Sequence, residues 1–217
     1  MKEYLEFLKI FEKAVLEARR DIDEIELIAV SKKKPTNLIR EVIQNGYQSF
    51  GENQLQEVEN KWISLKQEFH KTRLHFIGSI QSKKTEKIFE ICDVIHSIDR
   101  EKIVQKIKKC EDALKSKKEY FIQINTGNEP QKSGVDLKDA ENFIDKCLNQ
   151  YDLDLKGLMC IPPQNAYPEE HFIKLRDLGK NFNLPYLSMG MSEDFEVALK
   201  CGATHIRVGT KIFGARS

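Results

Sequence analysis

Short apolar runs alternate with longer amphipathic segments along almost all of this 217-residue chain. Each run is too short to form a helix and is typical of a strand buried on both faces. The runs lie at Glu26–Val30, Tyr47–Phe50, Leu74–Ile77, Val94–Ile98, Tyr120–Ile124, Leu155–Ile161, Tyr186–Met189 and His205–Val208. Because strict alternation of strands and helices builds a parallel sheet, eight such repeats predict a closed (β/α)8 barrel, the TIM barrel.

The segments between the runs have the periodicity of amphipathic helices. They cover Leu38–Ile43, Asn53–Lys66, Ser82–Cys92, Arg100–Ala113, Leu137–Leu148, Pro168–Phe182 and Ser192–Lys200, and a further helix with Tyr4, Leu8, Phe11, Val15 and Ala18 on one face precedes the first strand. A doubly wound open sheet is the alternative, but it would place a Gly-rich turn where Ser31-Lys32-Lys33-Lys34-Pro35 stands. We expect a single barrel domain over residues 1–217, with an extra N-terminal helix.

Charge and composition exclude several classes of function. The chain has 35 basic and 34 acidic side chains, so no basic excess is available to bind a nucleic-acid backbone. No apolar stretch is long enough to span a membrane, and charged residues interrupt the N-terminal segment, so we expect a cytoplasmic protein. The five cysteines are far apart and follow no C-x-x-C pattern, so neither disulfides nor a metal site is expected.

In a parallel barrel the active site forms at the carboxyl ends of the strands, and Lys32 follows the first of them. A partly desolvated lysine there could form a Schiff base with an aldehyde. The alternative is that Lys32, Lys33 and Lys34 are only a solvated turn. The loops after the seventh and eighth strands carry Gly190-Met191-Ser192 and Gly209-Thr210, where barrels often bind phosphate.

Three further polar residues near strand ends each allow two interpretations. Ser192 could be the N-cap of the next helix instead of a phosphate ligand, and Asn53 could likewise be a cap. Alternation along the eighth strand places Arg207 inside the barrel, where its partner is either a carboxylate such as Asp99 or a ligand acceptor. His75 is more typical of a satisfied core histidine than of a catalyst.

The motifs at these strand ends resemble those of the pyridoxal phosphate homeostasis proteins, in the same order and over nearly the whole chain. They are Ala29-Val30-Ser31-Lys32-x-Lys34-Pro35, Phe50-Gly51-Glu52-Asn53, His75-Phe76-Ile77-Gly78-x-x-Gln81-x-x-Lys84, Lys132-Ser133-Gly134, Gly157-Leu158-Met159-x-Ile161-Pro162, Leu187-Ser188-x-Gly190-Met191-Ser192-x-Asp194 and Arg207-x-Gly209-Thr210-x-Ile212-Phe213-Gly214. The resemblance implies the barrel of fold-type III enzymes that bind pyridoxal 5′-phosphate (PLP), the alanine racemase N-terminal domain, without a second domain.

The resemblance also implies a cofactor and its ligands. PLP would form a Schiff base with Lys32, its phosphate would contact Met191, Ser192, Gly209 and Thr210, and Arg207 would face the pyridine nitrogen. Asn53 completes the cofactor-binding set that we expect. Lys34, Lys84 and Lys132 could offer a second PLP position, and the sequence does not rank them.

The implied function is to hold, buffer and deliver PLP in vitamin B6 and amino-acid homeostasis, without robust catalysis and with no catalytic residue. The expected partners are PLP and PLP-requiring apo-enzymes, and the expected state is a monomer. The alternatives are a weak PLP-dependent amino-acid racemase with Lys32 as one base, and a protein that reports PLP status to a partner. A racemase would need a second base opposite Lys32, such as His75 or a nearby lysine.

Overall fold

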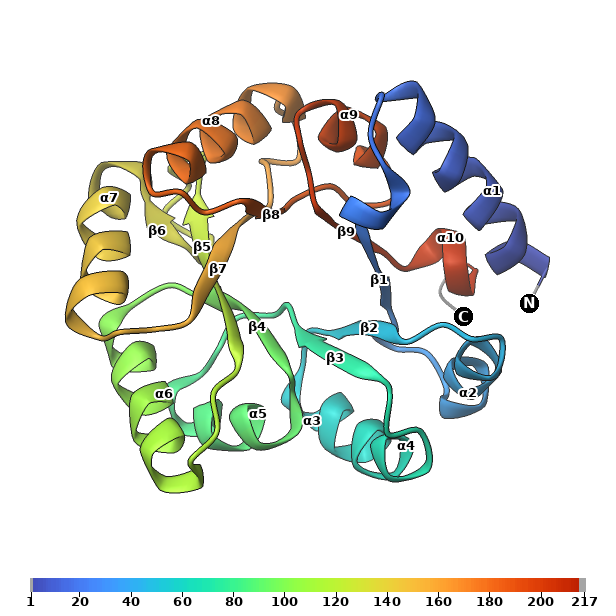
Figure 1. Cartoon of the computed structure of the whole chain (residues 1–217), viewed down its shortest axis with the longest axis horizontal. Helices are drawn as coiled ribbons and strands as arrows, with labels where there is room; N and C mark the ends of the chain where they lie inside the picture. The colour runs from blue at the N-terminus through green and yellow to red at the C-terminus, as the bar shows by residue number, and fades with distance from the viewer. Residues whose placement is uncertain (1, 215–217) are drawn as a thin grey trace.

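Eight parallel strands form a closed barrel in the computed structural model, which describes residues 2–214 (Figure 1). They are β1 (Glu26–Val30), β2 (Ser49–Glu52), β3 (Arg73–Phe76), β4 (Val94–Ile98), β5 (Glu119–Asn125), β7 (Leu155–Cys160), β8 (Tyr186–Ser188) and β9 (His205–Val208). The ring is closed by parallel pairing of β1 with β9 and of β4 with β5. The predicted (β/α)8 barrel is therefore confirmed.

Helices surround the ring on its outside (Figure 1). They are α1 (Lys2–Glu17), α2 (Thr36–Gln44), α3 (Leu55–Glu57), α4 (Ile63–Glu68), α5 (Thr85–Ile91), α6 (Glu101–Leu114), α7 (Leu137–Asp145), α8 (Pro168–Asn181), α9 (Phe195–Lys200) and α10 (Thr210–Phe213). Short 3₁₀ turns lie at η1 (Ile22–Glu24) and η3 (Ser82–Lys84), and π-helical turns at η2 (Val58–Trp62) and η4 (Lys146–Gln150). No helix in this described part is both long and apolar enough to cross a membrane.

Several local features differ from the sequence-based prediction. The strand expected at Tyr47–Phe50 lies at Ser49–Glu52, and the helix expected at Leu137–Leu148 ends at Asp145, where η4 follows it. A two-residue strand, β6 (Val135–Asp136), pairs with the end of β5 inside the long β5–α7 connection. The segment 53–66 is not one regular helix, because η2 interrupts it between α3 and α4. The helix expected from Ser192 begins only at Phe195. Periodicity predicts that a helix exists better than it predicts its first turn, where local side-chain hydrogen bonds decide the geometry.

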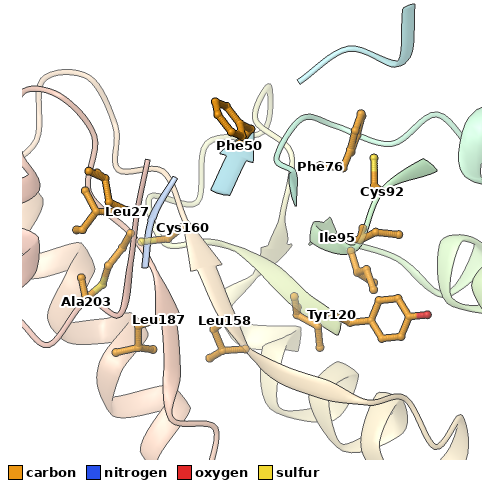
Figure 2. Close-up of a cluster of buried hydrophobic side chains, with 14 of the residues drawn as sticks. Leu27, Phe50, Phe76, Cys92, Ile95, Tyr120, Leu158, Cys160, Leu187 and Ala203 are labelled. Carbon is orange, nitrogen blue, oxygen red and sulfur yellow. The ribbon is translucent and has the colours of Figure 1, made fainter. Parts of the chain in front are cut away.

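The main hydrophobic core lies between the strands and the helices. Alternation sends one set of strand side chains outward into this layer, including Leu27, Phe50, Phe76, Tyr120 and Leu158 (Figure 2). All five are buried. This continuous apolar layer holds the barrel strands in register and leaves the opposite set of strand residues to fill the interior.

The barrel interior is unusually polar. Its apolar part is a small separate cluster of Val94, Phe121 and Met159. Buried histidine, serine and arginine side chains occupy much of the remaining space, and each needs a hydrogen-bond partner there.

The N-terminal helix α1 is part of the hydrophobic core and is not an appendage. Phe7 and Phe11 are buried, and both rings contact the ring of Phe195 in α9, with centroids 5.6 and 6.1 Å apart. The Nζ of Lys211 in α10 lies over the Phe195 ring at 4.9 Å. Helix α1 therefore packs against the last two helices of the chain, and the two ends lie on one side of the molecule (Figure 1).

Replacing Phe7 with Ala should lower the free energy of unfolding by about 3–5 kcal/mol, because the change removes a buried aromatic ring and leaves a cavity. Leu5, on the same helix, is 48% exposed, so Leu5→Ala is the matched control and should change stability by less than about 1 kcal/mol. Urea denaturation followed by circular dichroism measures both. Equal effects of the two substitutions would show that α1 is not part of the cooperative unit.

Candidate functional site

The predicted site residues come from four strands that are neighbours in the barrel. The sheet order places β2, β1, β9 and β8 side by side. Their carboxyl ends carry, in that order, Asn53, Lys32, Gly209-Thr210 and Met191-Ser192. The residues that sequence reasoning selected one by one therefore lie along one continuous arc of the barrel mouth.

The three lysines that follow β1 have three different environments. Lys33 is exposed, whereas Lys34 is buried and its Nζ donates to the backbone oxygens of Phe213 (3.2 Å) and Gly214 (2.9 Å). Lys32 is half-buried, and its ammonium group contacts no hydrogen-bond acceptor or carboxylate among residues 2–214. The interpretation of the run as a solvated turn fits Lys33 alone.

The backbone that carries Lys32 is held from beneath by Lys61, in η2. Lys61 Nζ donates to Ser31 O (2.9 Å) and pairs with the carboxylates of Glu52 (2.5 Å) and Glu57 (2.8 Å). Glu57 also accepts the Lys33 N–H at 2.5 Å, which supports the left-handed φ of 56° at Lys33. Two ion pairs therefore fix the conformation of the turn on both sides of Lys32.

Sequence reasoning missed this support. In the sequence, Glu52 belongs only to a strand-end motif, and Lys61 lies within a segment that is expected to be a regular helix. Glu52 is fully buried, and its Oε1 accepts from Ser31 Oγ (2.7 Å) and Trp62 Nε1 (3.3 Å) as well as pairing with Lys61. Burial raises the pKa of Glu52, and the nearby Lys61 only partly opposes that effect. The spacing of Glu57 and Lys61 by four residues was the available signal.

Asn53 does not cap a helix. The N-cap of α3 is Gln54, and its side chain makes no capping hydrogen bond. The Oδ1 atom of Asn53 is buried and has no hydrogen-bond partner among residues 2–214. A buried amide oxygen without a donor is costly, so its position at the mouth favours the ligand interpretation over the capping one.

Ser192 is not the N-cap of α9, which corrects the capping alternative. That position belongs to Asp194, whose Oδ1 accepts the backbone N–H of Met191 at 2.6 Å. Met191 is 37% exposed at the mouth. The Met191 N–H is therefore engaged by a carboxylate, and it would have to change partner to contact a phosphate.

The loops after β8 and β9 are joined by their hydroxyl groups. Thr210 Oγ1 donates to Ser192 Oγ at 3.0 Å. The backbone N–H groups of both residues point to no acceptor within residues 2–214. A side chain at Gly209 would place its Cβ 3.0 Å from Val30 O, so glycine allows the β9 loop to lie directly against the end of β1. Two hydroxyls and two N–H groups without an acceptor among residues 2–214 therefore lie together beside the Lys32 loop, and such a group of donors could hold an anion.

Arg207 lies inside the barrel below these loops, as predicted, but its partner is not Asp99. Its NH1 donates to Ser188 Oγ (2.7 Å) and its NH2 donates to Cys160 O (2.9 Å). Asp99 instead pairs with Arg100. Burial lowers the pKa of the Arg207 guanidinium, although the group stays a cation because its ordinary pKa is so high.

His75 is a buried, hydrogen-bonded core residue, as expected. It bonds to His96 (2.9 Å) and to Glu26 (3.0 Å), and no part of it is exposed. It is therefore not available as a second base at the mouth. Among residues 2–214, no group of three or more histidine, cysteine, aspartate or glutamate side chains could hold a metal ion.

The class of protein follows from this fold together with the comparison to known families. Residues 11–217 match the family model described as alanine racemase, N-terminal domain. The alanine racemase of Corynebacterium glutamicum has the same fold over 88% of this chain and 56% of its own, with a TM-score of 0.69 and 14% identity.

Curated relatives and a solved structure narrow the class. The pyridoxal phosphate homeostasis protein of Aquifex aeolicus is 36% identical over 96% of this chain and 95% of its own, and that of Pseudomonas aeruginosa is 40% identical over 92% and 88%. The structure of PipY from Synechococcus elongatus, solved with PLP bound, has a TM-score of 0.80 and 29% identity over 93% of this chain and 99% of its own. This chain belongs to the family of pyridoxal phosphate homeostasis proteins.

Replacing Lys61 with Met should lower the free energy of unfolding by about 3–5 kcal/mol, because the carboxylate of Glu52 would stay buried without its cation. Lys87→Met, which removes an exposed ion pair with Glu90, is the matched control and should cost less than about 1 kcal/mol. Urea denaturation at neutral pH compares them. A second substitution, Glu52→Gln, should recover part of the loss; no recovery would show that Lys61 does not act through Glu52.

Proposed function

We propose that this protein holds, buffers and delivers PLP, with the cofactor bound as a Schiff base to Lys32. The observation that carries the proposal is the arc of four adjacent strand ends, where a lysine with no partner among residues 2–214 lies beside two hydroxyls and two N–H groups that could contact a phosphate. Ser192, Gly209 and Thr210 would contact the phosphate, together with Met191 once its N–H leaves Asp194. Arg207 would face the pyridine nitrogen, and Asn53 would offer its amide to the cofactor.

The residues present fit such a cofactor in charge and in shape. The backbone N–H groups of Ser192 and Thr210 have no acceptor among residues 2–214, so a ligand phosphate would satisfy them. The Asn53 Oδ1 lacks a donor, so it would accept from a hydroxyl or N–H group of the ligand and not from the phosphate. When bound, PLP would supply an electron-withdrawing ring conjugated to an imine. The turn held by Lys61 would keep Lys32 in place for that bond.

Two features support a carrier over an enzyme. A guanidinium can only donate hydrogen bonds, so Arg207 would keep the pyridine nitrogen unprotonated and make the ring a weak electron sink. A racemase would also need a second base facing Lys32, and the burial of His75 speaks against that candidate. The weak racemase is the second candidate, and amino-acid turnover at a rate useful to a cell would favour it.

Several finer points belong to the same proposal. We infer that residues 1–217 act as one PLP-binding domain and as a monomer, because one chain supplies the whole arc. PLP-requiring apo-enzymes are the proposed recipients. A cytoplasmic location is supported by the five cysteines, all of them unpaired.

Replacing Lys32 with Ala should abolish covalent labelling by PLP, because no other amine follows β1 at the mouth in the same environment. The purified protein is mixed with PLP and reduced with borohydride, and its peptides are mapped by mass. The wild type should carry phosphopyridoxyl on Lys32, and Lys33→Ala, the matched control, should label like the wild type. Equal labelling of Lys32→Ala and the wild type would overturn the assignment of Lys32.

Replacing Ser192 or Thr210 with Ala should weaken noncovalent PLP binding about 10- to 100-fold, since one hydrogen bond to a charged group contributes roughly 1.5–3 kcal/mol. The affinity is measured by fluorescence titration in the Lys32→Ala background. Ser64→Ala, on the exposed side of α4, is the control and should leave the affinity unchanged. Unchanged affinity in both site variants would refute the phosphate site.

A further inference from the structure

A chain of hydrogen bonds runs through the barrel interior from Arg207 to the first residue of β1, Glu26. Arg207 NH1 is 2.7 Å from Ser188 Oγ, which is 2.9 Å from His96 Nδ1. His96 Nε2 is 2.9 Å from His75 Nδ1, and His75 Nε2 is 3.0 Å from Glu26 Oε1. The three links between the two charged ends are all fully buried side chains. The chain therefore joins the site at the mouth to the opposite, N-terminal end of the barrel.

The two charged ends force every hydrogen bond in this chain to point the same way. A carboxylate only accepts, so His75 must donate from Nε2 and accept at Nδ1. His96 must then donate from Nε2 and accept at Nδ1, which makes the Ser188 hydroxyl the donor to His96. Ser188 Oγ is left to accept from Arg207, which can only donate. These tautomers follow from the bonding pattern, and each neutral ring has one donor and one acceptor satisfied.

The surroundings of the two histidines keep them neutral and fixed. Burial lowers the pKa of His75 and lowers that of His96 well below its ordinary value. The ring of Phe121 stacks on His96 with centroids 4.3 Å apart and an interplanar angle of 3°. Because each neutral ring has one donor and one acceptor nitrogen, the hydrogen bond made at one end of the histidine pair determines which nitrogen donates at the other end.

Glu26 is held as a carboxylate by donors from three strands. His75 on β3 donates to its Oε1 and His205 on β9 to its Oε2 (3.1 Å), while Ser49 on β2 lies 2.8 Å from Oε1 and Arg73 on β3 lies 3.9 Å from Oε2. Burial works to raise the pKa of Glu26, but the hydrogen bonds from His205 and His75 outweigh it and hold the pKa well below the usual range.

Solvent reaches Glu26 from a polar cavity at the N-terminal end of the barrel. The cavity has a volume of about 570 Å³, and charged side chains of Arg73, Glu119 and Lys156 line it beside Glu26 and His205. The Glu26 side chain is 23% exposed there. The charge of Glu26 therefore lies at the face of the barrel opposite the mouth, with the hydrogen-bonded chain between them.

We propose that Glu26 is a positioning residue for Arg207, acting through His75, His96 and Ser188. By fixing the direction of the chain, Glu26 turns the Ser188 hydroxyl hydrogen toward His96 and leaves the lone pairs of Oγ facing Arg207 NH1, and so sets how the guanidinium is oriented beneath the mouth. This inference rests on the proposed function wherever it concerns PLP, because Arg207 is the group assigned to the pyridine nitrogen. The direction of the chain itself is a property of the protein without cofactor.

Substituting Glu26 with Gln tests the proposal because an amide has one acceptor side and one donor side. Glutamine can accept from either His75 or His205, but its NH₂ group faces the other histidine, which must change tautomer or lose its bond. Ring ¹⁵N NMR of the unliganded wild type should show Nε2–H tautomers at His75 and His96. Glu26→Gln should alter the ring signals of His96, which is separated from residue 26 by two hydrogen bonds through His75. Glu24→Gln, which lines the same cavity and pairs only with Arg20, is the matched control and should leave them unchanged.

A second variant shows which end of the chain sets its direction. Ser188→Ala removes the link to Arg207 and leaves Glu26 in contact with His75, so the Nε2–H tautomers of His75 and His96 should persist. A change of tautomer in Ser188→Ala, or unchanged His96 signals in Glu26→Gln, would overturn the proposal. Because Ser188→Ala keeps the Glu26 cluster intact, it decides the question even if Glu26→Gln does not fold.

The effect on the cofactor is measured as a pH titration of the visible absorbance of PLP-loaded protein. Loss of the Glu26 charge should make Arg207 a stronger hydrogen-bond donor to the pyridine nitrogen of PLP. The midpoint of the absorbance titration should therefore move to lower pH. In the Ser188→Ala background the same substitution should have less than half that effect. A full effect in that background would show a through-space charge effect and overturn the role of the chain. A wild type that takes up no PLP would refute the proposed function, while the NMR result would still decide the direction of the chain.

Discussion

The parallel pairing of β1 with β9 is the constraint on which the rest of this structure depends. It joins the first strand of the barrel to the last, with Ile28 opposite Arg207, and so closes the ring. Because the strands are parallel, closure also brings the loop after β1 against the loop after β9, where Gly209 lies directly on Val30. Lys32 and Thr210 are far apart in the sequence, and this ladder brings the loops that carry them together.

Buried polar side chains are stabilised by different interactions at the mouth and in the interior of the barrel. Beneath Lys32, charges are paired at short range, with Lys61 between Glu52 and Glu57. Along the interior, the buried side chains of His75, His96 and Ser188 separate the carboxylate of Glu26 from the guanidinium of Arg207. Direct pairing fixes a backbone turn, because it ties side chains to the carbonyl of Ser31. The longer chain fixes an orientation, because each neutral link has one donor and one acceptor direction.

The fold and the arc of site residues could be predicted from the sequence because they depend on short-range patterns. Strand alternation predicted that Arg207 faces inward, and the motif after β1 singled out Lys32. The partners of these residues could not be predicted, since they come from strands and turns that only closure brings together. Arg207 donates hydrogen bonds to Ser188 and Cys160 and not to Asp99. The N-cap of α9 is Asp194 and not Ser192. The π-helical turn that aims Lys61 and Trp62 at Glu52 leaves no trace in helical periodicity.

The N-terminal helix α1 packs on α9 and α10, and α10 begins at Thr210 at the barrel mouth. This packing connects α1 to the mouth through α10. Lys211, whose ammonium lies over the ring of Phe195 beside Phe7, directly follows Thr210. Opening of α1 would expose the aromatic cluster and release the short helix that carries the Thr210 hydroxyl. If an anion binds at Thr210, its occupancy and the local unfolding of α1 would be thermodynamically linked, and the bound ligand would slow amide exchange in Lys2–Glu17.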